Sequence, residues 1–252
     1  MSSLNFLLLS LASALLLSSC GPDKPAAPPP PPPKATIPGP DIATLTDSTA
    51  PAALLAYGQQ YPASEVRVKT KFGTIRVKLY DDTPIHKANF LLLARKGVFD
   101  ETMFNRVVRG FAIQGGQTFK PRTIRLRRYR LPPEMRPAHF HRKGALGMAR
   151  YDDEENPGRL SSNTDFYFVV GEKMPAAQAR AAAGRPLTPA QARAYATVGG
   201  TPGLDGQYTV FGEVIEGLEV IDKIAAVPVD PQDNWPTEDV DIKVEVVEAN
   251  VR

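Results

Sequence analysis

The sequence predicts a mainly β fold with some α-helix: a closed antiparallel barrel with helices over its ends and an Ala-rich helical insert. Three observations carry this prediction. Short segments that alternate apolar and polar residues recur between residues 65 and 250, as half-buried strands do. Only two segments, one early and one late, show the apolar period of a long amphipathic helix. With 252 residues and 42% apolar content, the chain is ample for one core.

The strands begin with a hairpin pattern. Val66 and Val68 alternate with polar residues, the Lys71-Phe72-Gly73 turn follows, and Ile75 to Leu79 alternates again. Seven or eight strands are expected in all, and the later ones are predicted at 104–108, 111–114, 145–149, 166–170, 208–214 and 240–247.

Two main helices and two short ones are expected. Thr83 is a suitable N-cap before Pro84, and Gly97 is a natural stop for the helix between them. The second main helix is predicted around 218–225. Within the insert, 174–198, two Ala-rich stretches each begin at a proline, which predicts two short helices, the second capped by Thr188.

The N-terminal 64 residues differ in composition from the rest. An apolar run over 7–17 is too short to span a bilayer comfortably and ends in small residues, as a signal peptide does. Leu17-Ser18-Ser19-Cys20 resembles the lipobox of bacterial lipoproteins, in which the cysteine becomes acylated. We therefore expect a signal peptide over 1–19, a lipidated Cys20 with a Pro-rich tether over 20–64, and a folded domain over 65–252. The alternative is a buried helix followed by a free thiol, and no Lys or Arg precedes the apolar run.

The tether holds ten of the 25 prolines between Gly21 and Pro40, a composition that favours extended polyproline II. At roughly 3.1 Å per residue, about twenty residues hold a domain some 60 Å from a bilayer. A ligand for SH3-like domains is the other interpretation of the proline run. A short helix is expected over 52–61. The predicted location is the bacterial cell envelope, lipid-anchored, with the domain on the non-cytoplasmic side.

Several function classes are excluded. The single cysteine rules out an internal disulfide and a thiolate metal cluster, and no phosphate-binding, dinucleotide-binding or Gly-x-Ser-x-Gly motif is present. The net charge of +3 gives no support to nucleic-acid binding. His139 and His141 lie two apart, but we expect both on a loop or strand surface and not on a metal.

One segment is far more specific. Phe104-Asn105-Arg106, then Gly110-Phe111 and Gln114-Gly115-Gly116, resembles the signature of the cyclophilins. Three further blocks agree in order: 144–150, 161–169 and 204–214. The resemblance covers about 65–250 and implies an eight-stranded barrel with two helices over its ends.

The resemblance implies peptidyl-prolyl cis-trans isomerase activity without a cofactor. The barrier to rotation comes from amide resonance, so an enzyme need only stabilise the twisted amide. Arg106 matches the family's catalytic arginine, whose guanidinium donates to the prolyl nitrogen as its lone pair returns. The partners are proline-containing polypeptides and, through acylated Cys20, a lipid bilayer; a monomer is expected.

The resemblance also implies a substrate site. The ring pocket would be lined by Phe111, Ala112, Tyr167 and Leu204, and the substrate chain flanked by Gln114, Ala149, Arg150, Asp165 and Tyr208. Four positions depart from the usual pattern: Ala112 replaces methionine, Asp165 glutamine, Gly203 tryptophan or histidine, and Tyr208 histidine. Asp165 is expected either to orient Arg106 or to compete with substrate for it. Because the family's cyclosporin site uses that tryptophan, weak cyclosporin binding is implied.

Two questions stay open. The barrel is either an active isomerase for exported proteins or a catalytically weak proline-peptide binding module or chaperone. Five arginines between Arg122 and Arg130 would either meet an anionic partner or lipid head group, or form a solvated strand neutralised in part by the acidic run 152–155.

Overall fold

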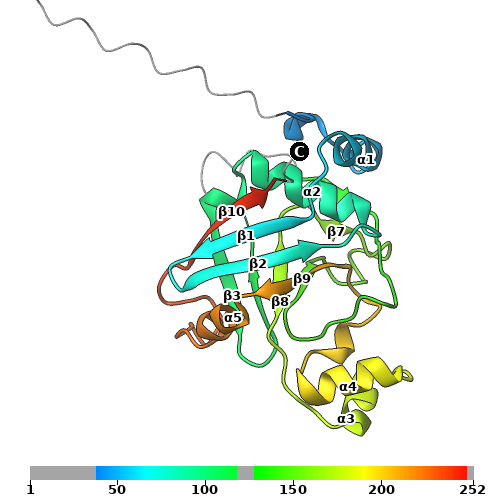
Figure 1. The fold of residues 1–252 in the computed structure, drawn as a ribbon, viewed down its shortest axis with the longest axis vertical. Helices are drawn as coiled ribbons and strands as arrows, with labels where there is room; N and C mark the ends of the chain where they lie inside the picture. Colours follow the sequence, from blue (N-terminus) through cyan, green and yellow to red (C-terminus); the bar gives the residue numbers. More distant parts are fainter. Residues whose placement is uncertain (1–37, 118–127, 249–252) are drawn as a thin grey trace, which may run out of the picture. The chain divides into compact units, whose positions relative to one another are not determined.

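Eight antiparallel strands close into one barrel in the computed structural model, which describes residues 38–117 and 128–248 (Figure 1). Around the barrel the order is β1-β10-β3-β4-β8-β6-β9-β2. Their bounds are β1 Glu65–Thr70, β2 Gly73–Leu79, β3 Thr102–Val108, β4 Ala112–Gly115, β6 Ala145–Met148, β8 Phe166–Val169, β9 Val210–Glu216 and β10 Asp241–Val247. The predicted barrel is confirmed.

The alternating pattern sets the register. Val66 pairs with Val77 and Val68 with Ile75 across the β1–β2 hairpin, so the same face of both strands is buried. A separate two-stranded sheet joins β5 (Arg130–Leu131) to β7 (Ser161–Ser162).

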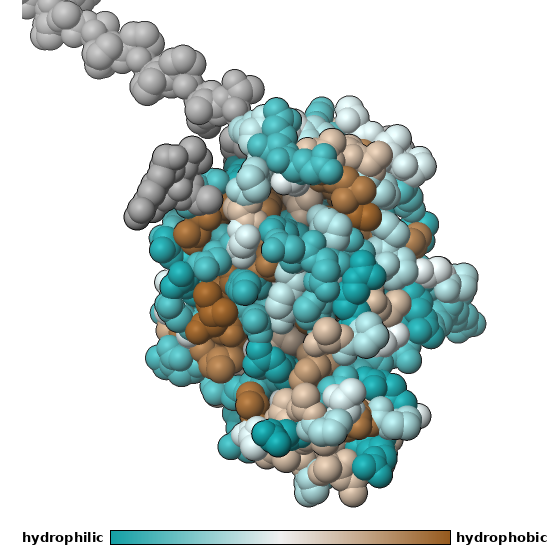
Figure 2. Space-filling view, turned by 45° about the vertical axis from the view of Figure 1, so that its right-hand side comes forward, coloured by the Kyte–Doolittle hydropathy of each residue, from teal (hydrophilic) through white to brown (hydrophobic). Residues whose placement is uncertain are grey.

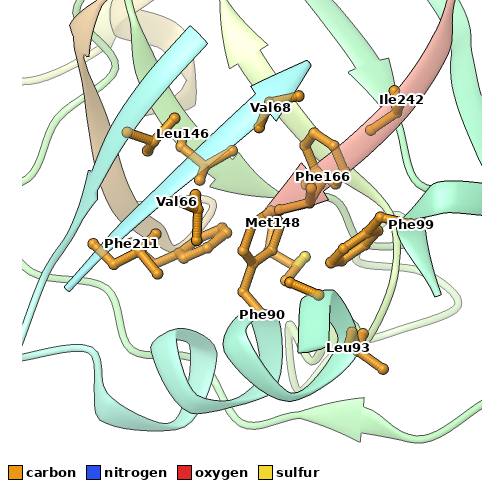
Figure 3. Close-up of a cluster of buried hydrophobic side chains, with 14 of the residues drawn as sticks. Val66, Val68, Phe90, Leu93, Phe99, Leu146, Met148, Phe166, Phe211 and Ile242 are labelled. Carbon is orange, nitrogen blue, oxygen red and sulfur yellow. The ribbon is translucent and has the colours of Figure 1, made fainter. Parts of the chain in front are cut away.

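Two helices cover the barrel, α2 (Pro84–Arg95) and α5 (Leu218–Ala225), as expected. The core between α2 and the barrel is aromatic (Figure 3). The Phe90 ring of α2 meets Phe166 edge to face, with 5.3 Å between centroids. Such a pair stabilises the fold by about 0.5–1.5 kcal/mol, in addition to the stabilisation that comes from burying the two rings.

The start of α2 differs in detail from the expectation. Thr83 precedes the helix, but its side chain makes no cap; its hydroxyl donates to the carbonyl of Tyr80. Glu134 replaces it: its carboxylate accepts the backbone N–H groups of Ile85 and His86, at 3.1 and 2.9 Å. A carboxylate at a helix N-terminus is favourable, and it also satisfies two otherwise unpaired donors.

The folded part extends toward the N-terminus beyond the expected boundary at Glu65. A 3-10 helix, η1 (Ile42–Thr44), and α1 (Ala50–Gln60) precede the barrel, and α1 packs on α2. Leu54 and Tyr57 of α1 are fully buried in the main core. Asp47 binds Arg130 of β5 in an ion pair at 2.8 Å. The helix expected over 52–61 is therefore present and belongs to the domain.

Several expectations fall outside the described residues. The signal peptide, Cys20, most of the proline run, and Arg122, Arg125 and Arg127 all belong to the undescribed segments 1–37 and 118–127. Within the described part of the chain, no helix has both the length and the apolar character needed to cross a bilayer.

The insert forms the small lobe at the bottom of Figures 1 and 2. It contains α3 (Ala176–Ala183) and α4 (Pro189–Thr197), as predicted. Thr188 caps α4 in a reciprocal box with Gln191, which confirms the predicted cap. The chain then returns to the barrel through the 3-10 helix η3 (Pro202–Leu204). A further 3-10 helix, η2 (Phe99–Glu101), precedes β3.

Candidate active site

The strand alternation that fills the barrel also builds a hollow on its outer wall. In β8, Phe166 and Phe168 lie in the main core, whereas Tyr167 and Val169 belong to a second apolar cluster formed with Ala112, Ala145 and Val210. Beside this cluster lies a pocket of about 330 Å³. Its lining is Arg106, Phe111, Ala112, Gln114, Ala149, Arg150, Asp152, Tyr167, Leu204 and Tyr208.

Arg106 reaches this pocket because β3 carries a bulge. Phe104 pairs with Gly115, but Arg106 pairs with Gln114, so Asn105 is an extra residue on β3. Without the bulge, Arg106 would face the core as Phe104 does. Asn105 is held in place by a bond from its side-chain amide to Gln117, at 2.8 Å.

The Arg106 guanidinium is exposed at the pocket. It makes no hydrogen bond or ion pair with any other residue that the structure describes. Its donors are therefore available to a ligand in the pocket. Asp152, an exposed residue that the sequence analysis did not place in the site, supplies a negative charge to the same lining.

One wall of the pocket is formed by three side chains that pack on one another: Tyr167, Tyr208 and Arg150. Tyr208 meets Tyr167 edge to face, with 6.1 Å between centroids, and the Arg150 guanidinium lies 4.6 Å from the Tyr208 ring centroid. Arg150 is in turn held by the Gln207 carbonyl at 2.9 Å and by Asp153 at 2.7 Å. The side chain of Arg150 is thus a support for Tyr208 and is largely covered.

Asp165 is the one expected site residue that does not line this pocket. It lines an adjoining hollow of about 190 Å³, with Gln114, Gln117, Arg128, Ala149, Arg150, Tyr151 and Ser162. Its carboxylate accepts a hydrogen bond from the Ser162 hydroxyl at 2.7 Å and makes none with Arg106. Burial raises the pKa of Asp165 above its ordinary value, against the opposing effect of the Ser162 bond. The expected pair with Arg106 is not formed.

The expectation of two surface histidines is wrong for His141. His139 is partly exposed and stacks on Tyr80, with 3.7 Å between ring centroids. His141 is buried, and its ring lies between Asp205 and the hydroxyl of Tyr167. Spacing along the chain gave no signal for this contact, because Asp205 follows His141 by 64 residues.

The sequence and the fold of this chain are similar to those of known proteins. The model of the cyclophilin-type peptidyl-prolyl cis-trans isomerase family matches residues 65–246. A Staphylococcus saprophyticus protein named as a peptidyl-prolyl cis-trans isomerase is 33% identical, over 71% of this chain and 89% of that protein. A Streptococcus pyogenes protein named as a bifunctional phosphatase/peptidyl-prolyl cis-trans isomerase is 34% identical over 73% of this chain; the match spans only 39% of its length.

Solved structures share the fold. A cyclophilin of Cryptosporidium parvum superposes with a TM-score of 0.54 at 22% identity, covering 74% of this chain and 99% of that one. The same protein in the presence of the dipeptide Ala-Pro gives a TM-score of 0.53 at 23% identity, covering 73% of this chain and 99% of that one. The chain belongs to the cyclophilin-type peptidyl-prolyl cis-trans isomerase family.

Proposed function

We propose that this cyclophilin rotates X-Pro bonds of exported polypeptides at the pocket on the outer barrel wall, with Arg106 as its catalytic residue. Rotation removes amide resonance, which sets a barrier of about 18–20 kcal/mol, and returns a lone pair to the prolyl nitrogen. A guanidinium donor placed there stabilises the twisted state more than the planar one, which is what accelerates a reaction.

The observation that carries the proposal is the state of Arg106. An exposed guanidinium without an internal partner in the described structure stands beside an apolar hollow formed by Phe111, Ala112 and Leu204. The hollow suits a prolyl ring, and a charge next to it suits the nitrogen of that ring.

A million-fold acceleration corresponds to about 8 kcal/mol, more than one hydrogen bond supplies. Binding of the ring and of the flanking substrate chain must contribute the rest. Gln114 pairs with Arg106 across β3 and β4 and lines the same pocket, which supports a role in holding that chain.

The test is a proline-limited peptide cleavage assay on the full chain in detergent. Turnover that is lost in Arg106→Ala supports the proposal. Peptide binding without turnover in the native chain would instead favour the proline-peptide binding module, which the departures at Ala112 and Asp165 would then explain.

We further propose that acylated Cys20 anchors the protein to a membrane of the bacterial envelope. Support comes from the sequence: a lipobox-like Leu17-Ser18-Ser19-Cys20, and a following run of prolines long enough to hold the domain away from the lipid. Two or three acyl chains anchor stably, whereas one chain does not.

Cys20→Ser tests the anchor. The variant should move from the membrane fraction to the soluble fraction and keep its isomerase activity, because the substitution lies outside the folded domain. A Cys20→Ser protein that still partitions into detergent would mean that the apolar segment is retained as a helix.

A further inference from the structure

A buried polar chain connects the Ala-rich insert to the wall of the pocket. At its centre is Asp205, whose side chain is only 1% exposed. One carboxylate oxygen, Oδ2, accepts from the Tyr195 hydroxyl at 2.7 Å and from Arg185 at 3.0 Å. The other, Oδ1, accepts the backbone N–H of His141 at 2.8 Å and lies 3.1 Å from its Nδ1.

The chemistry of Asp205 fixes the proton on His141. A carboxylate only accepts, so Nδ1 of His141 must carry a proton. Burial lowers the pKa of His141, in spite of the opposing effect of Asp205, and so leaves the ring neutral. Burial alone would raise the pKa of Asp205. The hydrogen bonds from His141 and Tyr195 outweigh this effect and hold the pKa below its ordinary value, so the carboxylate stays ionised.

The remaining ring nitrogen then becomes an acceptor. Nε2 of His141 lies 2.9 Å from the Tyr167 hydroxyl. Burial raises the pKa of Tyr167 well above its ordinary value, so its hydroxyl keeps its proton and donates a hydrogen bond to Nε2. Tyr167 lines the pocket, and its ring supports Tyr208 edge to face. The hydrogen bonds therefore meet at Asp205 from both sides. From the pocket, Tyr167 donates to His141 and His141 donates to Asp205. From the insert, Tyr195 and Arg185 donate to Asp205.

The insert also packs on the segment that carries a second lining residue. Leu204, a lining residue, is the last residue of η3 and directly precedes Asp205, and α3 packs on η3. A Cβ on Gly203 would lie 3.3 Å from the carbonyl oxygen of Ala182, which is tighter than most such contacts. The end of α3 thus occupies space that a side chain at 203 would need. Two residues further along, Tyr195 and Arg185 bind Asp205.

We propose that the insert, 174–198, is a positioning element of the active site: through Tyr195 and Arg185 it fixes Asp205, and through Asp205 and His141 it fixes Tyr167 in the pocket. Tyr195, Arg185, Asp205 and His141 are positioning residues, since none of them lines the pocket near Arg106. This inference rests on the proposed function of that pocket.

A double-mutant cycle between Tyr195 and Tyr167 tests the connection. Tyr195→Phe removes one donor to Asp205 and keeps the ring, and Tyr167→Phe removes the hydroxyl that the chain ends on. In the full chain, Tyr195→Phe should lower kcat/KM about threefold to tenfold, mostly through an increase in KM. This is the size expected when a hydrogen bond to a charged group is lost and only part of its free energy affects substrate binding at the pocket. In the Tyr167→Phe background the same change should have almost no effect.

The control is Tyr61→Phe, which also removes a hydroxyl but lies next to α1, away from this chain of contacts. It should leave kcat/KM unchanged in both backgrounds. Arg185→Gln can take the place of Tyr195→Phe in the same double-mutant cycle, because Arg185 also donates to Asp205. It carries less risk to folding, because Arg185 is partly exposed. The ¹⁵N shift of His141 Nε2, measured in each variant, reports the tautomer independently of activity.

Equal losses from Tyr195→Phe in the two backgrounds would overturn the proposal, because the insert would then act without Tyr167. So would the absence of any loss. If the native chain shows no turnover, the proposed function fails on its own; the same cycle measured on the Kd of a proline-containing peptide then still decides whether the insert positions the pocket.

Discussion

Phe104 and Arg106 are two residues apart on β3 and yet lie on opposite faces of the barrel wall. Phe104 packs in the core, whereas Arg106 stands at the outer pocket. A regular strand would put both on one face, and burying an unpaired guanidinium in the core would be very costly. The bulge at Asn105 resolves this conflict, and it places the guanidinium at the pocket that we propose as the substrate site.

Removal of the guanidinium should therefore act on catalysis more than on binding or stability. Arg106→Ala should lower kcat by about a hundredfold or more, the size of one lost preorganised donor, with a much smaller change in peptide affinity. Arg106→Lys should restore little, because an ammonium lacks the planar fork of the guanidinium. The proline-limited assay and peptide titration measure the two effects. Near-native turnover in Arg106→Ala would refute the mechanism.

The partly buried carboxyl of Asp165 should lower the free energy of unfolding as pH rises. Its pKa is raised in the folded protein, so the folded state binds more protons than the unfolded state in this range. The free energy of unfolding then falls as pH rises from about 4, where an unfolded Asp ionises, through the folded pKa. Asp165→Asn removes this fall. Denaturant titrations should show that the variant gains more relative to the native chain at pH 7 than at pH 3.

Asp239→Asn is the matched control, because this residue is exposed and its change also removes one carboxylate. A gain from Asp165→Asn that is the same at both pH values, or that Asp239→Asn reproduces, would contradict the prediction.

Cyclosporin should bind weakly. The resemblance to the family places a tryptophan at position 203 in the drug site, and here a glycine stands there with the Ala182 carbonyl close by. A large aromatic contact and a donor are lost, and Ala112 offers less apolar surface than methionine. Calorimetry measures the affinity. Tight binding would show that the 203 region is not the counterpart of the drug site.

The sequence predicted the barrel well because strand burial follows a two-residue period that short-range alternation records, as in Val66 and Val68. It also brought Phe111, Tyr167 and Leu204 together through the family motif. It did not predict what depends on distant partners. Glu134 caps α2 although it lies 48 residues further along the chain. The buried ring of His141 is bound by Asp205, which is 64 residues further along. The bulge at Asn105 likewise depends on the pairing with β4, which no local pattern records.

The N-terminal helix gives a last prediction, on stability. The match to the family begins at residue 65, but Leu54 of α1 is fully buried in the main core, and the adjacent Leu55 is 38% exposed. Leu54→Ala should lower the free energy of unfolding by about 2–5 kcal/mol, since it removes buried methyl groups and leaves a cavity. Leu55→Ala should change it by only about 0.5 kcal/mol or less.

Urea unfolding monitored by the fluorescence of the single tryptophan, Trp235, measures both variants in one cooperative transition if α1 and the barrel form one unit. A shift of the whole transition in Leu54→Ala, at an unchanged slope, is the expected result. Two equal and negligible shifts would mean that residues 38–64 belong to the tether. A loss confined to circular dichroism, with the Trp235 transition unmoved, would mean that α1 unfolds separately from the barrel, and would contradict its place in the shared core.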